Sequence, residues 1–353
     1  MTARVHTGRV YLDWNATAPL RQEARAAMLA AMDVAGNPSS VHAEGRAAKA
    51  IVERARVQVA EAVGAAPDEV IFTSGATEAA ALVLAGRGLV GAAVEHECVA
   101  AWIDTCLPVD ADGAVAVSAP ERTALQAANS ETGVLQRPRS GLAVIDAAQA
   151  LGKVPFAFRW TGAEAAILSS PKLGGPRGTG ALILRQGAET SPRQRGGGQE
   201  MGRRAGTENV VGIAGFGAAA AAAARDLADG EWDRVAETRN ILESALDSAA
   251  SETIFVGKAA ARLPNTSCFA APGWKAETQV MRMDLAGFAI SAGSACSSGK
   301  VRAGRTLAAM GFDPEVAASA VRVSIGPTTT RDQILAFVEV WSEGLRRFRR
   351  RAA

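Results

Sequence analysis

In this 353-residue chain, the sequence around Lys172 indicates a chemically reactive side chain. It follows a short apolar segment, Ala165 to Leu168, with serines before it and glycines after it. A lysine just beyond a buried strand is partly desolvated, which favours the neutral amine, and a neutral amine can form a Schiff base. The glycines that follow allow a close approach of the backbone. The pattern predicts a reactive amine at this position.

Asp146 ends a second apolar segment, Leu142 to Ile145. An acid at the end of a buried strand needs a partner to offset its desolvation. One such partner is the protonated nitrogen of a pyridine ring, which the aspartate would hold so that the ring can draw electrons. An aspartate that caps the following turn fits the sequence equally well.

The segment Ser74 to Glu78 is a candidate phosphate site. It lies between an apolar strand, Val70 to Phe72, and an alanine-rich helix, Ala79 to Ala85. Backbone N–H groups at a helix start attract anions, and Thr77 adds a hydroxyl. The segment matches neither the dinucleotide nor the Walker pattern, so an ordinary helix cap fits equally well.

Two further residues complete the set. Cys296 lies among glycines and serines in Ser291 to Gly299, so we expect an accessible thiol, which is a candidate nucleophile. Arg322 stands between apolar neighbours in the expected strand Val321 to Ile325. If it points inward, its guanidinium suits a bidentate grip on a substrate carboxylate; if it points outward, it lies on a solvated face.

The elements that must position these residues alternate between strand and helix, which favours an α/β sheet. Short apolar segments such as Ala181 to Leu184 are typical of buried parallel strands. Expected helices cover residues 44–63, 210–229 and 231–250, the second with seven consecutive alanines. Shorter strands at 254–256, 267–270 and 321–325 then predict a smaller α+β domain. We expect a large domain over 15–250 and a small one over 1–14 and 251–353.

Composition excludes several classes of protein. A net charge of +2 gives no general reason to expect nucleic acid or an anionic membrane as partner. No uncharged run of about 18 apolar residues occurs, and the first residues lack a secretory apolar core, so we expect a cytosolic protein. No two cysteines have zinc-ligand spacing, and no metal is expected. Five arginines between Arg346 and Arg351 indicate a solvated helix end or a patch for an acidic partner.

Taken together and in this order, the motifs resemble the cysteine desulfurases of the NifS/IscS type. These are class V aminotransferases among the fold-type I enzymes that use pyridoxal 5'-phosphate (PLP). The shared motifs are YLDWNATAP, GNPSSVH, VIFTSGATE, VEHECV, NSETGV, DAAQALGK, GGGQE, GTENV, LPNTS, SAGSACSSG and VRVSIG. The resemblance implies a large domain with a mostly parallel, seven-stranded-type sheet flanked by helices, and a smaller α+β domain that carries the cysteine loop.

The resemblance also implies a role for each residue. Lys172 would bind PLP covalently, His96 would stack on its ring and move protons, and Cys296 would take the sulfur as a persulfide. The other cofactor contacts would be Asp146 at the ring nitrogen, Gln149 at the ring hydroxyl, Ser130, and Ala76, Thr77 and Ser169 at the phosphate, with Thr207 from the second subunit of a homodimer. Arg322, Asn37 and Asn129 would bind the substrate.

The chain departs from the family pattern in several places. Pro171 replaces a histidine before the lysine, and Ser130 replaces the second asparagine of an Asn-Asn-Glu motif. The stretches 85–95 and 131–146 are short, the latter by about one helix, so the usual parallel crossover is not expected there. Residues 300–305 lack the usual Pro-Ser step.

The expected function is conversion of L-cysteine to L-alanine, with the sulfur passed to a protein acceptor for iron–sulfur clusters or another pathway. One alternative is a selenocysteine lyase or another class V lyase or aminotransferase, against which Cys296 argues. Another is a degenerate paralogue without catalysis, which Pro171 and Ser130 motivate.

Overall fold

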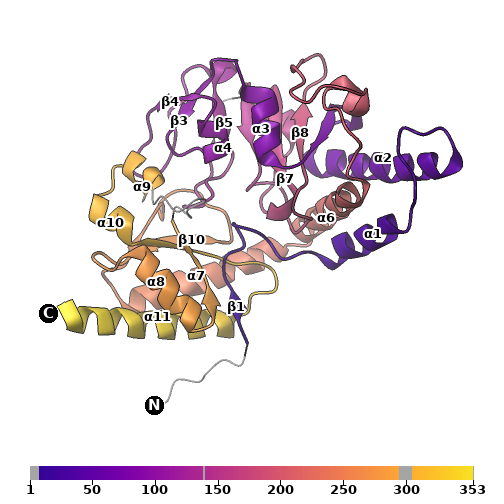
Figure 1. The fold of residues 1–353 in the computed structure, drawn as a ribbon. Helices are drawn as coiled ribbons and strands as arrows, with labels where there is room; N and C mark the ends of the chain where they lie inside the picture. Colours follow the sequence, from indigo (N-terminus) through magenta and orange to yellow (C-terminus); the bar gives the residue numbers. More distant parts are fainter. Residues whose placement is uncertain (1–7, 138–139, 294–303, 353) are drawn as a thin grey trace.

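The computed structural model describes residues 8–137, 140–293 and 304–352, which form a large and a small domain (Figure 1). The first and last described residues, Gly8 and Ala352, lie at the small domain. Cys296, the expected nucleophile, lies outside the described residues.

The large domain is built on a sheet with strand order β2-β8-β7-β6-β5. A parallel bridge between Val90 and Thr123 adds the pair β3–β4 beside β5. The strands are β2 (Val70–Thr73), β3 (Val90–Ala92), β4 (Asp104–Leu107), β5 (Ala124–Gln126), β6 (Val144–Asp146), β7 (Ala165–Ser169) and β8 (Gly180–Leu184). The expected mostly parallel sheet is therefore present.

The direction of β8 differs from the prediction. We expected Ala181 to Leu184 to be a parallel strand, but β8 runs antiparallel to both β7 and β2. Only residues 170–179 connect β7 to β8, and a parallel return needs a longer crossover. This short connection carries Lys172.

Strand periodicity divides the sheet between two apolar cores. Phe72, Leu168 and Ile183 pack with the helices on one face, whereas Ile71 and Ile167 pack with those on the other. Successive side chains of a strand point to opposite faces, so a strand buried on both sides reads as one apolar run. This explains why all five residues of β7 and of β8 are buried.

Helices cover both faces of the sheet (Figure 1). One side carries α1 (Gln22–Met32), α2 (Ala43–Val63) and α6 (Val210–Ala228), and the other carries α3 (Ala76–Leu84). Of the helices in the described part of the chain, only α6 is long and apolar enough to cross a membrane, and 56% of its apolar window is buried inside the protein.

The shortened segment between Glu131 and Asp146 connects two parallel strands without a helix in its described part. Strands β5 and β6 still pair in parallel, and the chain between them, residues 127–143, contains no helix in its described part. The other short stretch, 85–95, contains β3, and the four-residue helix α4 (Glu97–Ala100) follows it on the way to β4. Irregular chain thus replaces helices at this edge of the sheet.

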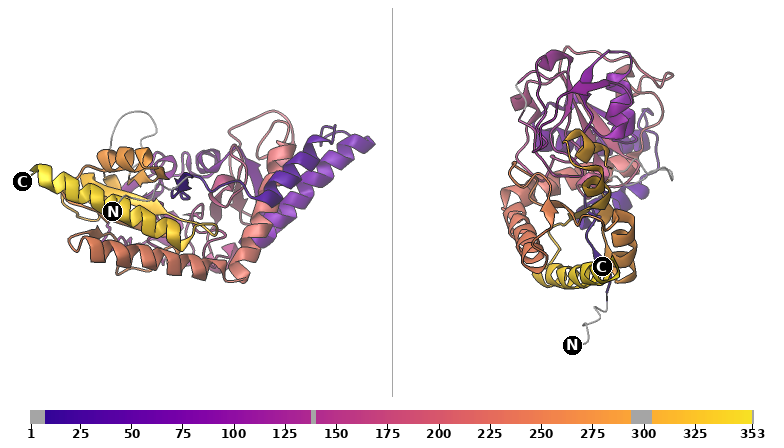
Figure 2. Two further views of the ribbon diagram at one scale, coloured as in Figure 1. Left: turned by 90° about the horizontal axis from the view of Figure 1, so that it is seen from below. Right: turned by 90° about the vertical axis from the view of Figure 1, so that its left-hand side faces the viewer.

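The small domain contains the antiparallel sheet β12-β13-β10-β9 and the parallel pair β1–β11. Its helices α7, α8 and α11 surround a core that includes Trp341 and Phe269 (Figure 2). The strands are β1 (Val10–Tyr11), β9 (Ile254–Phe255), β10 (Thr266–Ala270), β11 (Phe288–Ala289), β12 (Ser291–Ala292) and β13 (Ala320–Ser324), and the helices are α7 (Glu231–Ala249), α8 (Ala276–Leu285), α9 (Arg305–Ala309), α10 (Pro314–Ser319) and α11 (Arg331–Ala352).

Short helices complete the large domain. These are the helix α5 (Phe158–Thr161) and four 3-10 turns (Pro67–Glu69, Pro120–Arg122, Ser170–Lys172 and Gln199–Gly202).

The packing of α7 indicates where the two domains meet. The apolar side of α7, with Trp232 and Leu242, packs into the core of the small domain. The expected boundary near residue 250 stays a prediction, and this packing favours one near residue 230.

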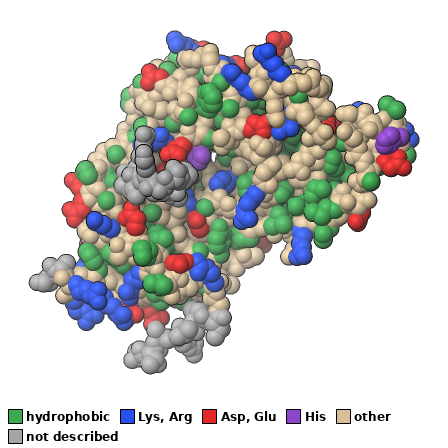
Figure 3. All heavy atoms as spheres, in the orientation of Figure 1, with side chains coloured by type: hydrophobic (Ala, Val, Ile, Leu, Met, Phe, Trp, Pro, Cys, Tyr) green, Lys and Arg blue, Asp and Glu red, His purple; other side chains and the backbone are tan. Residues whose placement is uncertain are grey.

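The arginine-rich end of α11 lies at the surface, where basic side chains gather (Figure 3). Arg349 pairs with Glu252, and Arg347 pairs with Glu343 one turn earlier. Cations at a helix C-terminus complement its dipole. These contacts favour the solvated helix end over a dedicated docking patch.

Candidate active site

The amine of Lys172 lies at the junction of the two domains. Strand β7 ends at Ser169, and the turn Ser170–Lys172 directs the lysine toward the N-terminal segment. Its Nζ donates to the backbone oxygens of Asn15 at 3.0 Å and Ala16 at 2.7 Å. Desolvation, and then the positive charge of Arg322, lower the pKa of this amine. A lowered pKa increases the neutral, nucleophilic fraction of the amine.

Asp146 is the last residue of β6, which pairs in parallel with β7. Its side chain is buried, and Oδ1 accepts the N–H of Ala148 at 2.9 Å. Asp146 therefore does cap the following turn, which was the alternative interpretation of this residue. Burial raises the pKa of this carboxyl, while the charges of His96 and Lys172 oppose the rise. Oδ2 has no hydrogen-bond partner among the described residues, so it can accept from a cationic ring N–H.

His96 precedes α4 and caps it, because its Nδ1 accepts the N–H of Cys98 at 3.2 Å. The ring keeps an exposed edge, yet its neighbours desolvate it enough to lower the pKa of the imidazole. Asp146 opposes this shift, and Lys172 reinforces it. These couplings place His96, Asp146 and Lys172 in one electrostatic group.

The start of α3 provides an anion site beside this group. The helix begins at Ala76, and no side chain caps its first turn, so the N–H groups of that turn are available to an anion. Strand pairing aligns Ser169 with Gly180 of β8, which in turn aligns with Thr73 just before the helix. The register thus brings Ser169 toward the turn that carries Thr77.

Arg322 points inward from β13, with a side chain only 6% exposed. Its Nη2 contacts Asp13 Oδ1 at 2.6 Å, and its Nη1 donates to the oxygen of Ser130 at 3.0 Å. Its Nε is buried without a partner in the described part of the protein. A buried guanidinium with a free donor suits a small anionic ligand.

Asn15 accepts hydrogen bonds from three side chains of the site, Lys172, Gln149 and Lys153. Its backbone oxygen accepts from Lys172 and, at 2.9 Å, from Nε2 of Gln149. Its side-chain oxygen accepts from the buried amine of Lys153 at 3.1 Å, and Lys153 also donates to Gln149. Both amide atoms of Gln149 are therefore engaged, although Nε2 has a second hydrogen left for a ligand. Desolvation holds the pKa of Lys153 well below its usual range.

Asn129 builds the turn that follows β5. Its Oδ1 accepts N–H groups of Glu131 at 2.9 Å and Thr132 at 2.8 Å, and its Nδ2 donates to Val94 O at 3.0 Å. The turn presents the oxygen of Ser130 to Arg322 and to the side chain of Asn15. In this chain Asn129 thus positions Ser130, and its expected contact with substrate stays a prediction.

Asn37 and Thr207 do not join this group within the single chain. Asn37 is exposed and accepts the N–H of Ser39. Thr207 lines a pocket with Ser74 and Glu200. Their expected roles stay predictions, and Thr207 was expected to act in the other subunit.

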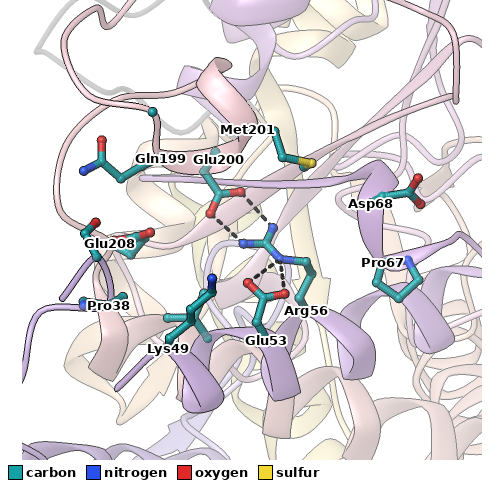
Figure 4. Close-up of a pocket in the computed structure, with 13 residues that line it drawn as sticks. Pro38, Lys49, Glu53, Arg56, Pro67, Asp68, Gln199, Glu200, Met201 and Glu208 are labelled. Carbon is teal, nitrogen blue, oxygen red and sulfur yellow. Dashed lines mark hydrogen bonds and ion pairs between the residues drawn. The ribbon is translucent and has the colours of Figure 1, made fainter. Parts of the chain in front are cut away.

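A buried ion pair lies at the pocket drawn in Figure 4, which is lined by Pro38 and Glu208, the chain neighbours of Asn37 and Thr207. Arg56 and Glu200 join through two hydrogen bonds of 2.8 Å each. Glu200 and Met201 have left-handed backbone, with φ of 48° and 58°. The pair therefore holds a strained turn in place.

Sequence reasoning missed several polar residues around the site. Glu95 is buried with Oε1 unpartnered in the described structure, and burial holds its pKa well above the usual range. Asp13, Asn15, Lys153 and Cys98 were missed as well. Each lies inside one of the motifs that carried the resemblance, so position within a motif was the signal available.

The comparisons with known proteins agree with this geometry. Residues 10–103 and 124–337 match the family model "Aminotransferase class-V". The chain is 38% identical to a cysteine desulfurase of Cereibacter sphaeroides over 94% of both chains. It is 34% identical to the cysteine desulfurase IscS of Dictyoglomus turgidum over 92% of this chain and 91% of the other. A NifS-like protein from Rickettsia africae matches with a TM-score of 0.85 and 29% identity, over 95% of this chain and 99% of that one. This chain belongs to the class V aminotransferase family.

Proposed function

We propose that this protein is a PLP-dependent cysteine desulfurase, which converts L-cysteine to L-alanine and keeps the sulfur as an enzyme persulfide. The observation that carries the proposal is the desolvated amine of Lys172 in one group with Asp146, His96 and Arg322. An amine, a buried acid and a guanidinium are the groups that a carbonyl cofactor and an amino acid require. The desulfurase relatives over nearly the full length support this choice of reaction.

The residues present fit PLP. Lys172 would hold the aldehyde, the free Oδ2 of Asp146 the ring nitrogen, and the uncapped start of α3, with Ala76, Thr77 and Ser169, the phosphate. When bound, PLP draws electrons from the α-carbon of an amino acid. Pro171, where the family has histidine, is the middle residue of the lysine turn, and its oxygen accepts the N–H of Ala18 at 2.9 Å. That turn is therefore held by the backbone.

Arg322 is the proposed partner of the substrate carboxylate. Its contact with Asp13 means that a substrate carboxylate would compete with this aspartate for the guanidinium, or use the unpartnered Nε. Ser130, the proposed cofactor contact, already accepts from the same guanidinium through its backbone oxygen. We keep Asn37 and Asn129 as proposed substrate contacts.

Cys296 is the proposed sulfur acceptor, and the residues on both sides of segment 294–303 support it. Ser291 pairs with Arg322 across β12 and β13. Beyond the segment, Arg305 donates to the oxygen of Glu95, which precedes His96. The described residues on both sides of the segment, Ser291 and Arg305, thus lie beside the site. The thiolate of Cys296 would attack the substrate sulfur; the electrons of the broken carbon–sulfur bond stay with the carbon, which takes a proton and leaves as alanine.

The proposal includes a cytosolic homodimer that passes sulfur to a protein acceptor. Exposed apolar side chains on and near α1 and α2 support a second copy as partner, and Figure 3 shows hydrophobic side chains over α1. They are Leu29, Met32, Val41, Val57 and Met201, between 41% and 88% exposed. Asn37, in the connection between α1 and α2, is also exposed. A charge in the patch, Met32→Glu, should give monomers in sedimentation velocity, whereas exposed Trp160→Glu on α5 should not.

A spectrum and a product assay test the proposal. The protein incubated with PLP should gain a visible absorption band that Lys172→Ala removes, and should release alanine from cysteine. Cys296→Ala should keep the band and lose sulfur transfer, and the control Cys106→Ala should keep both. A protein that stays colourless, or a Cys296→Ala variant with the normal rate, would contradict the proposal. Parallel assays with selenocysteine and cysteine sulfinate determine substrate preference.

A further inference from the structure

Cys98 forms a thiol–imidazole pair with His96 that the proposed function does not use. The Sγ of Cys98 lies 2.9 Å from Nδ1 of His96, and the backbone N–H of Cys98 donates to the same nitrogen at 3.2 Å. The side chain of Thr77 also hydrogen-bonds to this thiol. A half-buried thiol thus connects the proposed phosphate site to the imidazole.

The backbone contact fixes the tautomer of His96. A backbone N–H can only donate, so Nδ1 must carry a lone pair in this arrangement. A neutral imidazole with an unprotonated Nδ1 has its proton on Nε2. Nε2 has no hydrogen-bond partner among the residues that the structure describes, so its N–H is available to a ligand.

The thiol reinforces this tautomer. A thiol can accept from one neighbour and donate to another, here from the hydroxyl of Thr77 and to Nδ1 of His96. A thiolate would instead face the lone pair of Nδ1. Desolvation, followed by the negative charge of Asp146, raises the pKa of Cys98 to about 12, so the thiol keeps its proton at neutral pH.

We propose that Cys98 is a positioning residue that holds His96 neutral with its ring proton on Nε2, so that the imidazole offers a hydrogen-bond donor and not a lone pair at its free nitrogen. In the proposed desulfurase reaction, on which this role rests, His96 then stabilises developing negative charge by an N–H contact. The amine of Lys172 is left as the neighbouring base.

Several charged groups act on the same ring. Asp146 and Glu97 favour its protonated form, whereas Lys172 and Arg305 disfavour it. Protonation of Nδ1 would also turn its hydrogen toward the backbone N–H of Cys98. Desolvation is the largest effect and lowers the pKa of His96. The neutral ring is therefore the state that the surroundings support at neutral pH.

Nitrogen-15 NMR of the PLP-free protein tests this directly, since the chain has only three histidines. His96→Gln assigns the signal of His96. We expect a pyridine-type shift for Nδ1 and a pyrrole-type shift for Nε2. Cys98→Ala removes the thiol donor and should raise the protonation constant of His96 about fivefold, the equivalent of one hydrogen bond of about 1 kcal/mol. Cys98→Ser, which keeps a donor, should restore it, and Cys106→Ala should change nothing.

Three results would overturn the proposal: a proton on Nδ1 at neutral pH, a protonation constant in Cys98→Ala equal to that of the wild type, or no restoration in Cys98→Ser. If the alanine variant does not fold, the wild-type tautomer and the serine variant still decide. The NMR result does not depend on turnover. A protein without desulfurase activity but with the expected tautomer would refute the proposed function and leave the role of Cys98 intact.

Discussion

Removing the charge of Glu200 should destabilise the large domain strongly. In Glu200→Gln the carboxylate that accepts twice from Arg56 and once from the N–H of Phe72 becomes an amide. The side chains of Arg56 and Glu200 are only 8% and 2% exposed, so the variant leaves a buried guanidinium without its main counter-charge. Breaking a buried pair costs about 3–5 kcal/mol. Glu53 still contacts Arg56 at 3.2 Å and is 51% exposed, so we expect the lower end, about 3 kcal/mol.

Urea denaturation followed by circular dichroism measures this loss. With a slope of about 3 kcal/mol per M, the midpoint should fall by about 1 M. The matched control is Glu343→Gln, which breaks the exposed pair with Arg347 one turn away and should cost less than about 0.5 kcal/mol. A loss below about 1 kcal/mol in Glu200→Gln would refute the reasoning, because it would mean that Arg56 finds other compensation.

Two further predictions concern pH and packing. Burial raises the pKa of Glu131 to about 7. The protonated form is therefore favoured in the folded state, and its stabilisation is complete below pH about 4.5 and lost as the pH rises through about 7, by at most about 3 kcal/mol. Glu131→Gln should remove this slope in urea midpoints measured between pH 5 and 8, and an unchanged slope would disprove the assignment. In Gly217→Ala, the added Cβ would lie 2.6 Å from Cα of Ala55, so α6 and α2 must separate. Thermal unfolding should show a loss of about 1–3 kcal/mol even though alanine is the better helix former, and an increase in stability would contradict the packing argument.

The sequence predicted the elements well where pattern and burial coincide. The strand Ala165–Ser169 reads as one apolar run because helices cover both of its faces. The direction of Gly180–Leu184 could not be read from the same kind of run, since apolar content is identical for either direction. The short connection 170–179 sets the antiparallel direction of this strand.

The sequence predicted which side chains form the site, but it did not predict the hydrogen bonds that connect them. Lys172 and Asp146 stand at strand ends, where local context marks them. The role of Asn15 was hidden, because its partners Lys153 and Asn265 lie far along the chain. The buried orientation of Arg322 also needed the structure, since an alternating strand pattern does not show which face is covered.

The hydrogen bonds of Asn15 set the order in which the site can be completed during synthesis. The segment that carries it is held by Ser324, 309 residues later, and by Thr266, 251 residues later. Because domains fold as the chain emerges, the large domain can form while these partners are still unmade. The amine of Lys172 gains its two carbonyl acceptors only when Asn15 and Ala16 are in place. The nascent large domain must therefore carry an incomplete lysine site until the last strand, β13, has left the ribosome.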